Sequence, residues 1–151
     1  MNKLSPTEAA WLAGLVDGDG CLTISRGRTQ RGQGQPKFDI SSRDVWLLEY
    51  IAALIGVGRP TSGGYNRGRK YWHYQLCGGH LKELLPQILP YLVYKRPQAE
   101  VLLLWSTTHR TRRECRVVLS PEELELRKVC REKIYALNAT PEVDHARTPA
   151  A

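Results

Sequence analysis

The sequence lacks the features that define several common classes of protein. None of its apolar stretches is long enough to cross a bilayer, and its N-terminus lacks the basic and then apolar segments of a signal peptide. Its four cysteines are widely spaced, without a Cys-x-x-Cys pair, and no histidine lies at zinc-ligand spacing. These absences argue against a membrane protein, a zinc site and a disulfide framework. We therefore expect a soluble, intracellular protein with reduced thiols, and both a bacterial cytoplasm and an organelle fit.

The composition indicates one domain with a basic surface. At 151 residues and 42% hydrophobic content, the chain is long enough for one core and short for two. The net charge of +7 is uneven, because residues 26–70 carry nine basic and three acidic side chains. A second group of arginines lies at residues 110–116. The local excess favours a polyanionic partner over an ordinary solvated surface.

The most informative segment reads Leu-Ala-Gly-Leu-Val-Asp-Gly-Asp-Gly-Cys at residues 12–21. Ser5, Pro6 and Glu8 form a helix start with a capping box, and the apolar pattern predicts a helix to about Val16. Two acids then follow at the C-terminal end of the helix, which already carries about half a negative charge. A divalent cation would offset this repulsion.

The Asp-Gly-Asp-Gly segment has two other possible interpretations. Taken alone, such a segment is most often a solvated turn. A calcium-binding loop is excluded, because Leu15 and Arg26 would occupy its first and last ligand positions.

The remaining pattern predicts two strand pairs among helices. Alternation predicts strands at 22–25 and 37–41, joined by a polar hairpin tip, and at 58–62 and 71–77, joined by a turn at 63–69. Helices are expected from the Asp44 cap to Ile55, at 81–89, at 97–108, and from 121 to about 137. This order predicts an α+β fold in which helices back a four-stranded antiparallel sheet. The domain is expected to span 1–138, with a loosely ordered tail at 139–151.

The segment at 12–21 resembles the signature of the LAGLIDADG homing endonucleases. Segments 55–58 (Ile-Gly-Val-Gly), 90–95 and 135–138 are also similar to those of the single-motif, homodimeric, chloroplast-type members from group I introns. The resemblance implies an α-β-β-α-β-β-α domain with a saddle-shaped sheet and additional C-terminal helices. It also implies a homodimer that makes metal-dependent double-strand breaks in a long pseudo-palindromic DNA target.

Two alternatives of other classes stay open. Relatives with this fold act as RNA maturases or as DNA-binding modules that do not cleave. The chain could also be a general basic nucleic-acid binder whose motif helix is purely structural.

The resemblance assigns the metal site. Asp19 corresponds to the metal-binding acid, and the Gly18 carbonyl to a backbone ligand beside it. The implied metal is Mg²⁺, with Mn²⁺ as a substitute and with Ca²⁺ supporting binding but little cleavage. Asp17 corresponds to an acid that braces the helix end.

The resemblance also suggests residues near the reacting phosphate. Lys95 matches the basic residue that stabilises charge or polarises water. Ser42 falls where many members carry Gln, and a serine acts there only through an additional water or not at all. Arg43 is a candidate for the second basic residue, because the chain is about two residues shorter at this place.

The DNA-binding residues are expected on the strand faces opposite the core and at the hairpin tips. These are Thr23, Ser25, Lys37, Asp39, Ser41, Arg59, Thr61, Tyr71, His73 and Gln75 on the strands, and Arg26, Arg28, Gln30, Arg31, Gln33, Arg43, Arg67, Arg69 and Lys70 at the tips and turns. Two-stranded ribbons fit the DNA major groove. Tip residues that touch only phosphates are the alternative.

Small residues on the motif helix predict where a second copy would pack. The expected dimer interface consists of Ala10, Ala13, Gly14 and Asp17, because small side chains let two helix backbones approach closely. Packing of this face within the monomer is the alternative.

Overall fold

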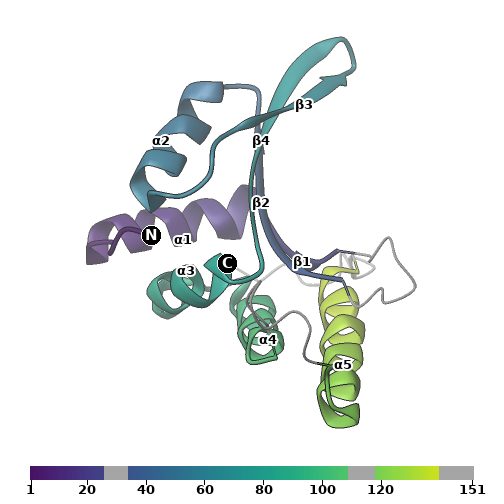
Figure 1. Ribbon diagram of the computed structural model, residues 1–151. Coiled ribbons are helices and arrows are strands. Elements are labelled where there is room, and N and C mark those ends of the chain that lie inside the picture. Colours follow the sequence, from purple (N-terminus) through teal and green to yellow (C-terminus); the bar gives the residue numbers. More distant parts are fainter. Residues whose placement is uncertain (26–33, 109–117, 140–151) are drawn as a thin grey trace, which may run out of the picture.

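The computed structural model describes residues 1–25, 34–108 and 118–139 (Figure 1). The elements run in the order α1 (Pro6–Asp19), β1 (Gly20–Ile24), β2 (Pro36–Ser42), α2 (Val45–Ile55), β3 (Thr61–Asn66), β4 (Arg69–Cys77), α3 (His80–Ile88), a 3₁₀ turn (Leu89–Tyr91), α4 (Arg96–Ser106) and α5 (Pro121–Asn138). The predicted α+β fold with a four-stranded sheet is confirmed.

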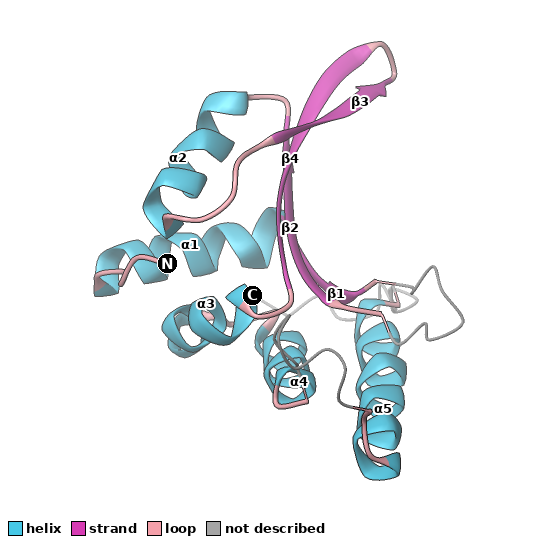
Figure 2. Cartoon of the chain, viewed as in Figure 1, coloured by secondary structure: helices cyan, strands magenta, loops and turns pink. Residues whose placement is uncertain are grey.

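The sheet is antiparallel, with strand order β1-β2-β4-β3. It is curved, and α1, α2 and α3 lie on one side of it, while the β3–β4 hairpin projects beyond the helices (Figure 2). Strand β1 is an edge strand, and α5 covers its outer edge. The Tyr135 hydroxyl donates to the Ile24 carbonyl at 3.2 Å, and the Asn138 amide donates to the Leu22 carbonyl at 2.9 Å. These bonds satisfy edge carbonyls that would otherwise be open to pairing with another chain.

The core lies between the sheet and the helices, and period-two alternation builds its sheet side. Leu22, Phe38, Ile40 and Leu76 are buried, while their neighbours along each strand face away from the core. The predicted helix starts are confirmed at Ser5 and Ser120, both with capping boxes, and at the Asp44 cap. Gly56 ends α2 in the left-handed conformation.

The first helix is longer than its apolar pattern predicts. It continues through the Asp-Gly-Asp segment to Asp19 instead of ending near Val16. The chain leaves the helix at Gly20, where a Cβ would lie 2.8 Å from both the Cα and the carbonyl oxygen of Val16. Only glycine allows β1 to begin this close to the last turn of α1.

The second hairpin turns later than predicted. Strand β3 runs from Thr61 to Asn66 rather than over 58–62, so Arg59 lies in the loop before it. The turn consists of Arg67 and Gly68 alone, with φ angles of 49° and 74°. Positive φ at both central residues defines a type I′ turn, which matches the twist of the two strands. The earlier glycine pair instead lies within β3, where the pairing with β4 is irregular between Ser62 and Gly64.

Several predicted features lie outside the described residues. They are Arg26, Arg28, Gln30, Arg31 and Gln33 of the first hairpin tip, the arginines at 110–116, and the tail from 140 onward. Within the described part, α5 ends at Asn138, and Cys21, Cys77 and Cys130 carry free thiols. No helix in this part is both long and apolar enough to cross a membrane.

Candidate functional site

Hydrogen bonds made by Asp17 and Lys95 join the end of α1 to the loop before α4. The Asp17 carboxylate accepts from the backbone N–H groups of Val93 and Lys95, both at 2.7 Å. In return, the Lys95 ammonium donates to the carbonyl oxygens of Val16 and Asp17, at 2.8 and 2.9 Å. A cation thus lies on the negative end of the α1 dipole. The charge conflict in the sequence is therefore partly resolved within the chain itself.

The hydrogen bonds keep Asp17 ionised. Burial alone would raise its pKa, but the amides of Val93, Lys95 and Tyr94, together with the Lys95 charge, outweigh burial and hold the pKa below its usual value. The ionised carboxylate therefore stabilises the fold at neutral pH. That contribution disappears as the pH falls through the lowered pKa.

We expect Asp17→Asn to lower the free energy of unfolding by about 1–3 kcal/mol at neutral pH, because an amide has a single acceptor oxygen for two backbone donors. The difference between wild type and variant should shrink as the pH falls through and below 3.8, the ordinary pKa of the group. Urea denaturation followed by circular dichroism across this pH range measures both effects. A difference that stays constant at acidic pH would show that Asp17 does not stabilise the fold through its charge.

Asp19 and Gly18 lie exposed at the end of α1, where the chain enters the sheet. No hydrogen bond to the Asp19 carboxylate comes from the part of the chain described. In the same ranges, no group of three or more His, Cys, Asp or Glu side chains is placed to hold a metal. Magnesium is often held by one or two carboxylates, with water and phosphate oxygens as the remaining ligands. Asp19 and the Gly18 carbonyl fit such a site only if DNA or a second chain supplies further oxygens.

Ser42 and Arg43 lie in the connection between β2 and α2. The Ser42 hydroxyl accepts from the backbone N–H of Asp44 at 3.0 Å, and Ser42 continues the inward-facing positions of β2. This serine is thus engaged in the turn that starts α2. Arg43 is exposed in the same turn.

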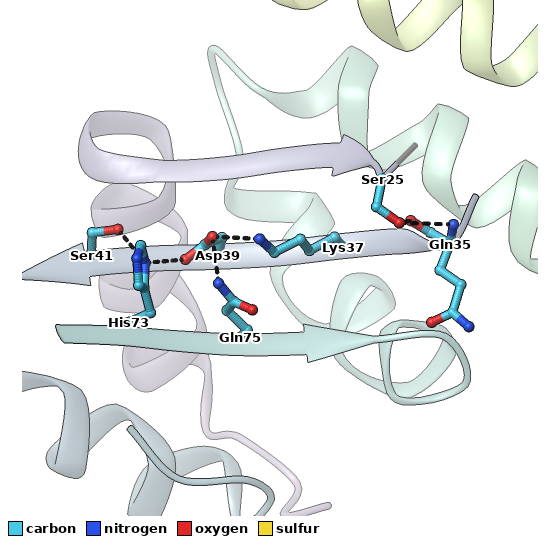
Figure 3. Close-up of polar contacts among 7 residues, drawn as sticks. All are labelled: Ser25, Gln35, Lys37, Asp39, Ser41, His73 and Gln75. Carbon is cyan, nitrogen blue, oxygen red and sulfur yellow. Dashed lines mark hydrogen bonds and ion pairs between the residues drawn. The ribbon is translucent and has the colours of Figure 1, made fainter. Parts of the chain in front are cut away.

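The outer face of the sheet carries the polar residues that alternation predicts. Lys37, Asp39 and Ser41 on β2 lie beside His73 and Gln75 on β4 (Figure 3). None of the helices in the described ranges covers this face of the sheet (Figure 2). Thr23 lies on the same face of β1, while the Ser25 hydroxyl contacts the backbone of Gln35 just past the strand ends.

Some predicted DNA-binding residues take other positions. Lys70 lies over the ring of Trp72, with its Nζ 4.2 Å from the ring centroid, and therefore on the face opposite Tyr71. Arg67 and Arg69 are exposed at the tip of the β3–β4 hairpin, and Thr61 is exposed at the start of β3. Cys21 and Cys77 also lie on the outer face, and strand alternation would have identified both.

Only part of the predicted dimer interface on α1 is exposed. Ala10 and Gly14 are exposed, but Ala13 is fully buried in the core of the single chain and cannot contact a partner. A Cβ added at Gly14 or at Gly18 would meet no atom within 4 Å. This side of the helix is therefore open.

An exposed aromatic group borders this open side and was missed from the sequence. Trp11 on α1 packs edge-on against Tyr50, which stacks on Trp46 of α2. The exposed fractions are 41%, 45% and 65% for Trp11, Tyr50 and Trp46. Leu48 and Ile51 of α2 lie in the core, whereas Trp46 on the same helix lies outside it.

Comparisons with known proteins agree with this geometry. The family model of the LAGLIDADG endonucleases matches residues 12–97. The DNA endonuclease I-CvuI of Chlorella vulgaris is 30% identical over 111 residues, and the match covers 62% of this chain and 60% of that protein. The chain thus matches less than two thirds of this relative's length.

Solved structures show the same fold. I-CvuI bound to its target in the presence of calcium superposes with a TM-score of 0.73 at 24% identity, covering 91% of this chain and 85% of that one. The archaeal intron-encoded homing endonuclease I-Vdi141I, complexed with DNA, gives 0.70 at 13% identity, covering 89% and 86%. With the motif at the end of α1 and the uncovered polar sheet face beside it, the family match over more than half of the sequence shows that this chain belongs to the LAGLIDADG endonuclease family.

Proposed function

We propose that the chain is a site-specific DNA endonuclease that acts as a homodimer and requires magnesium. The observation that carries this proposal is the position of Asp19. It lies exposed where the open side of α1 meets the uncovered face of the sheet. A second copy on α1 and DNA on the sheet would therefore meet at this carboxylate.

Asp19 and the Gly18 carbonyl are the proposed metal ligands, with Mg²⁺ as the working ion, Mn²⁺ as a substitute and Ca²⁺ supporting binding but little cleavage. The metal would activate the attacking water and neutralise charge on the phosphate. Lys95 holds the end of α1 in place and has one N–H left, since two of its three donors are engaged. We assign that donor to the reacting phosphate. Ser42 would act only through an additional water, since its hydroxyl accepts one hydrogen bond from the Asp44 N–H and keeps its own O–H as a donor.

Two copies are needed because one chain offers a single exposed motif carboxylate for two strand breaks. Ala10 and Gly14 permit close approach of two α1 helices, and Trp11, Trp46 and Tyr50 extend the apolar surface at its border. Exposed aromatic groups of this kind are typical of interaction sites rather than of free surface. A two-fold dimer would match a pseudo-palindromic target.

The outer face of the sheet is the proposed DNA surface. Strand residues facing away from the core would contact base edges, and the β3–β4 hairpin, which projects beyond the helices, would extend the contact (Figure 1). Arg67 and Arg69 are exposed at its tip, where they would meet the DNA backbone.

We expect Arg67→Asn to stabilise the protein slightly while weakening DNA binding. Arg67 holds a positive φ of 49°, which asparagine tolerates better, so the variant should gain up to about 1 kcal/mol of stability. Losing one phosphate contact should reduce the slope of log affinity against log salt by about one. Thermal unfolding and binding at several salt concentrations test both effects. An unchanged salt slope would place Arg67 off the DNA.

The direct test is incubation of the protein and Mg²⁺ with a randomised DNA library, followed by sequencing of the cut ends, with EDTA as the control. We expect cleavage at one sequence family. Tight, sequence-specific binding without cleavage in Mg²⁺ or Mn²⁺ would favour the non-cleaving DNA-binding module instead. The observation that supports this second candidate is Ser42, at a position where many members carry Gln. Preferential binding of structured RNA would favour the maturase.

A further inference from the structure

Asp39 is the one carboxylate among the outward-facing residues described on this basic sheet face. It accepts from three side chains: Lys37 at 2.8 Å, His73 at 3.2 Å and Gln75 at 3.0 Å (Figure 3). Its side chain is only 14% exposed. The carboxylate is therefore covered by its donors, and DNA would meet those donors rather than Asp39 itself.

The neighbouring serine and histidine do not make a hydrolytic triad. Ser41 Oγ lies 2.8 Å from His73 Nδ1, and Asp39 Oδ1 lies 3.2 Å from the same nitrogen. A nucleophile and an orienting acid need opposite nitrogens of the ring. The geometry therefore does not fit nucleophilic catalysis by Ser41.

The contact with Asp39 fixes the direction of the Gln75 amide. A carboxylate only accepts hydrogen bonds, so the Gln75 NH₂ group must face Asp39 and the carbonyl Oε1 must face elsewhere. One N–H is used, which leaves Oε1 and one N–H on this exposed side chain. Adenine presents an amino group and the acceptor N7 in the major groove, and this pair is complementary to one acceptor and one donor.

The His73 ring is fixed by hydrogen-bonding contacts on one edge and by packing on the other. The contact with Asp39 needs a hydrogen on Nδ1, and the closer Ser41 hydroxyl oxygen then accepts from the same hydrogen. On its other edge the ring packs over Gly63, where a Cβ would lie 2.6 and 2.7 Å from His73 Cδ2 and Nε2. The glycine in β3 thus makes room for the ring that contacts Asp39.

We propose that Asp39 is a positioning residue for sequence recognition, which fixes Gln75 to read adenine through one acceptor and one donor. The inference rests on the proposed DNA-binding role of this face. Asp39→Asn removes the constraint, because the new amide can donate to Gln75 Oε1 and allow the side chain to flip. A flipped Gln75 presents two donors, which suit the N7 and O6 acceptors of guanine.

The experiment uses the full chain and the target recovered from the randomised library. Each base pair of one half-site is varied, and the affinity of every variant target is measured in Ca²⁺ for wild type and Asp39→Asn. We expect the preference for adenine over guanine at one position to fall about tenfold in Asp39→Asn. Glu49→Gln, on an exposed position of α2, makes the same charge change on the other side of the sheet and should leave that preference unchanged.

A second comparison separates positioning from a general loss of structure. In a Gln75→Ala background the adenine preference should already be lost, and adding Asp39→Asn should change nothing further at that position. Three results would overturn the proposal. Asp39→Asn could keep the wild-type base preferences, or it could have the same effect with and without Gln75. It could also remove a preference for cytosine, which would mean that Asp39 itself contacts the base. Failure of the library to yield any target would instead contradict the proposed function.

Discussion

Asp19→Asn should abolish DNA cleavage in Mg²⁺ while leaving DNA binding tight. The substitution removes the charge that holds the metal but leaves the outer sheet face intact, because Asp19 lies outside the sheet and has no hydrogen-bond partner in the described part of the chain. Loss of the metal removes several kcal/mol of transition-state stabilisation, so the rate should fall by at least about a thousandfold.

Asp44→Asn is the matched control for Asp19→Asn. It removes one carboxylate from the N-cap of α2, where asparagine caps equally well. Plasmid cleavage and binding in Ca²⁺ are measured for both variants. Near wild-type cleavage by Asp19→Asn would show that the metal site lies elsewhere.

Gly14→Leu should prevent dimerisation and double-strand cleavage together without unfolding the chain. A Cβ at Gly14 meets nothing within 4 Å, so a leucine fits the monomer. Between two paired α1 helices the same side chain would push the backbones apart and separate the two Asp19 sites. A displacement of about 1 Å can cost some hundredfold in rate.

The control for Gly14→Leu is Ala136→Leu, at an exposed position of α5. Sedimentation gives the oligomeric state, and a supercoiled plasmid that carries the target distinguishes single from double breaks. A Gly14→Leu protein that remains a dimer and cuts both strands normally would exclude the α1 interface. A wild-type protein that stays monomeric on DNA would exclude the homodimer altogether.

The features of the fold that depend on neighbouring residues were predictable from sequence. The caps at Ser5, Asp44 and Ser120 and the alternation of Leu22, Phe38 and Ile40 follow from contacts a few residues apart. The same alternation correctly placed Lys37, Asp39, Ser41, His73 and Gln75 on the outer face.

The features that depend on tertiary contacts were not predictable. The hydrogen bonds of Asp17 and Lys95 join two positions that lie 78 residues apart in the sequence. They explain why α1 can continue past Val16 with acids at its end. The Asp39 cluster requires the register of β2 against β4, which the sequence does not specify. Ala13 is buried because α1 is apolar on more than one side, so small residues alone did not identify its open side.

The central claim is that two copies of this chain, each with one Asp19, cut the two strands of a single DNA site. Sequencing both ends of every fragment produced from the randomised library in Mg²⁺ tests it most directly. We predict one pseudo-palindromic sequence family, with the cuts on the two strands related by its two-fold axis and absent with Asp19→Asn. Cuts on one strand only, cuts without a common sequence, or cleavage that persists in Asp19→Asn would contradict the account.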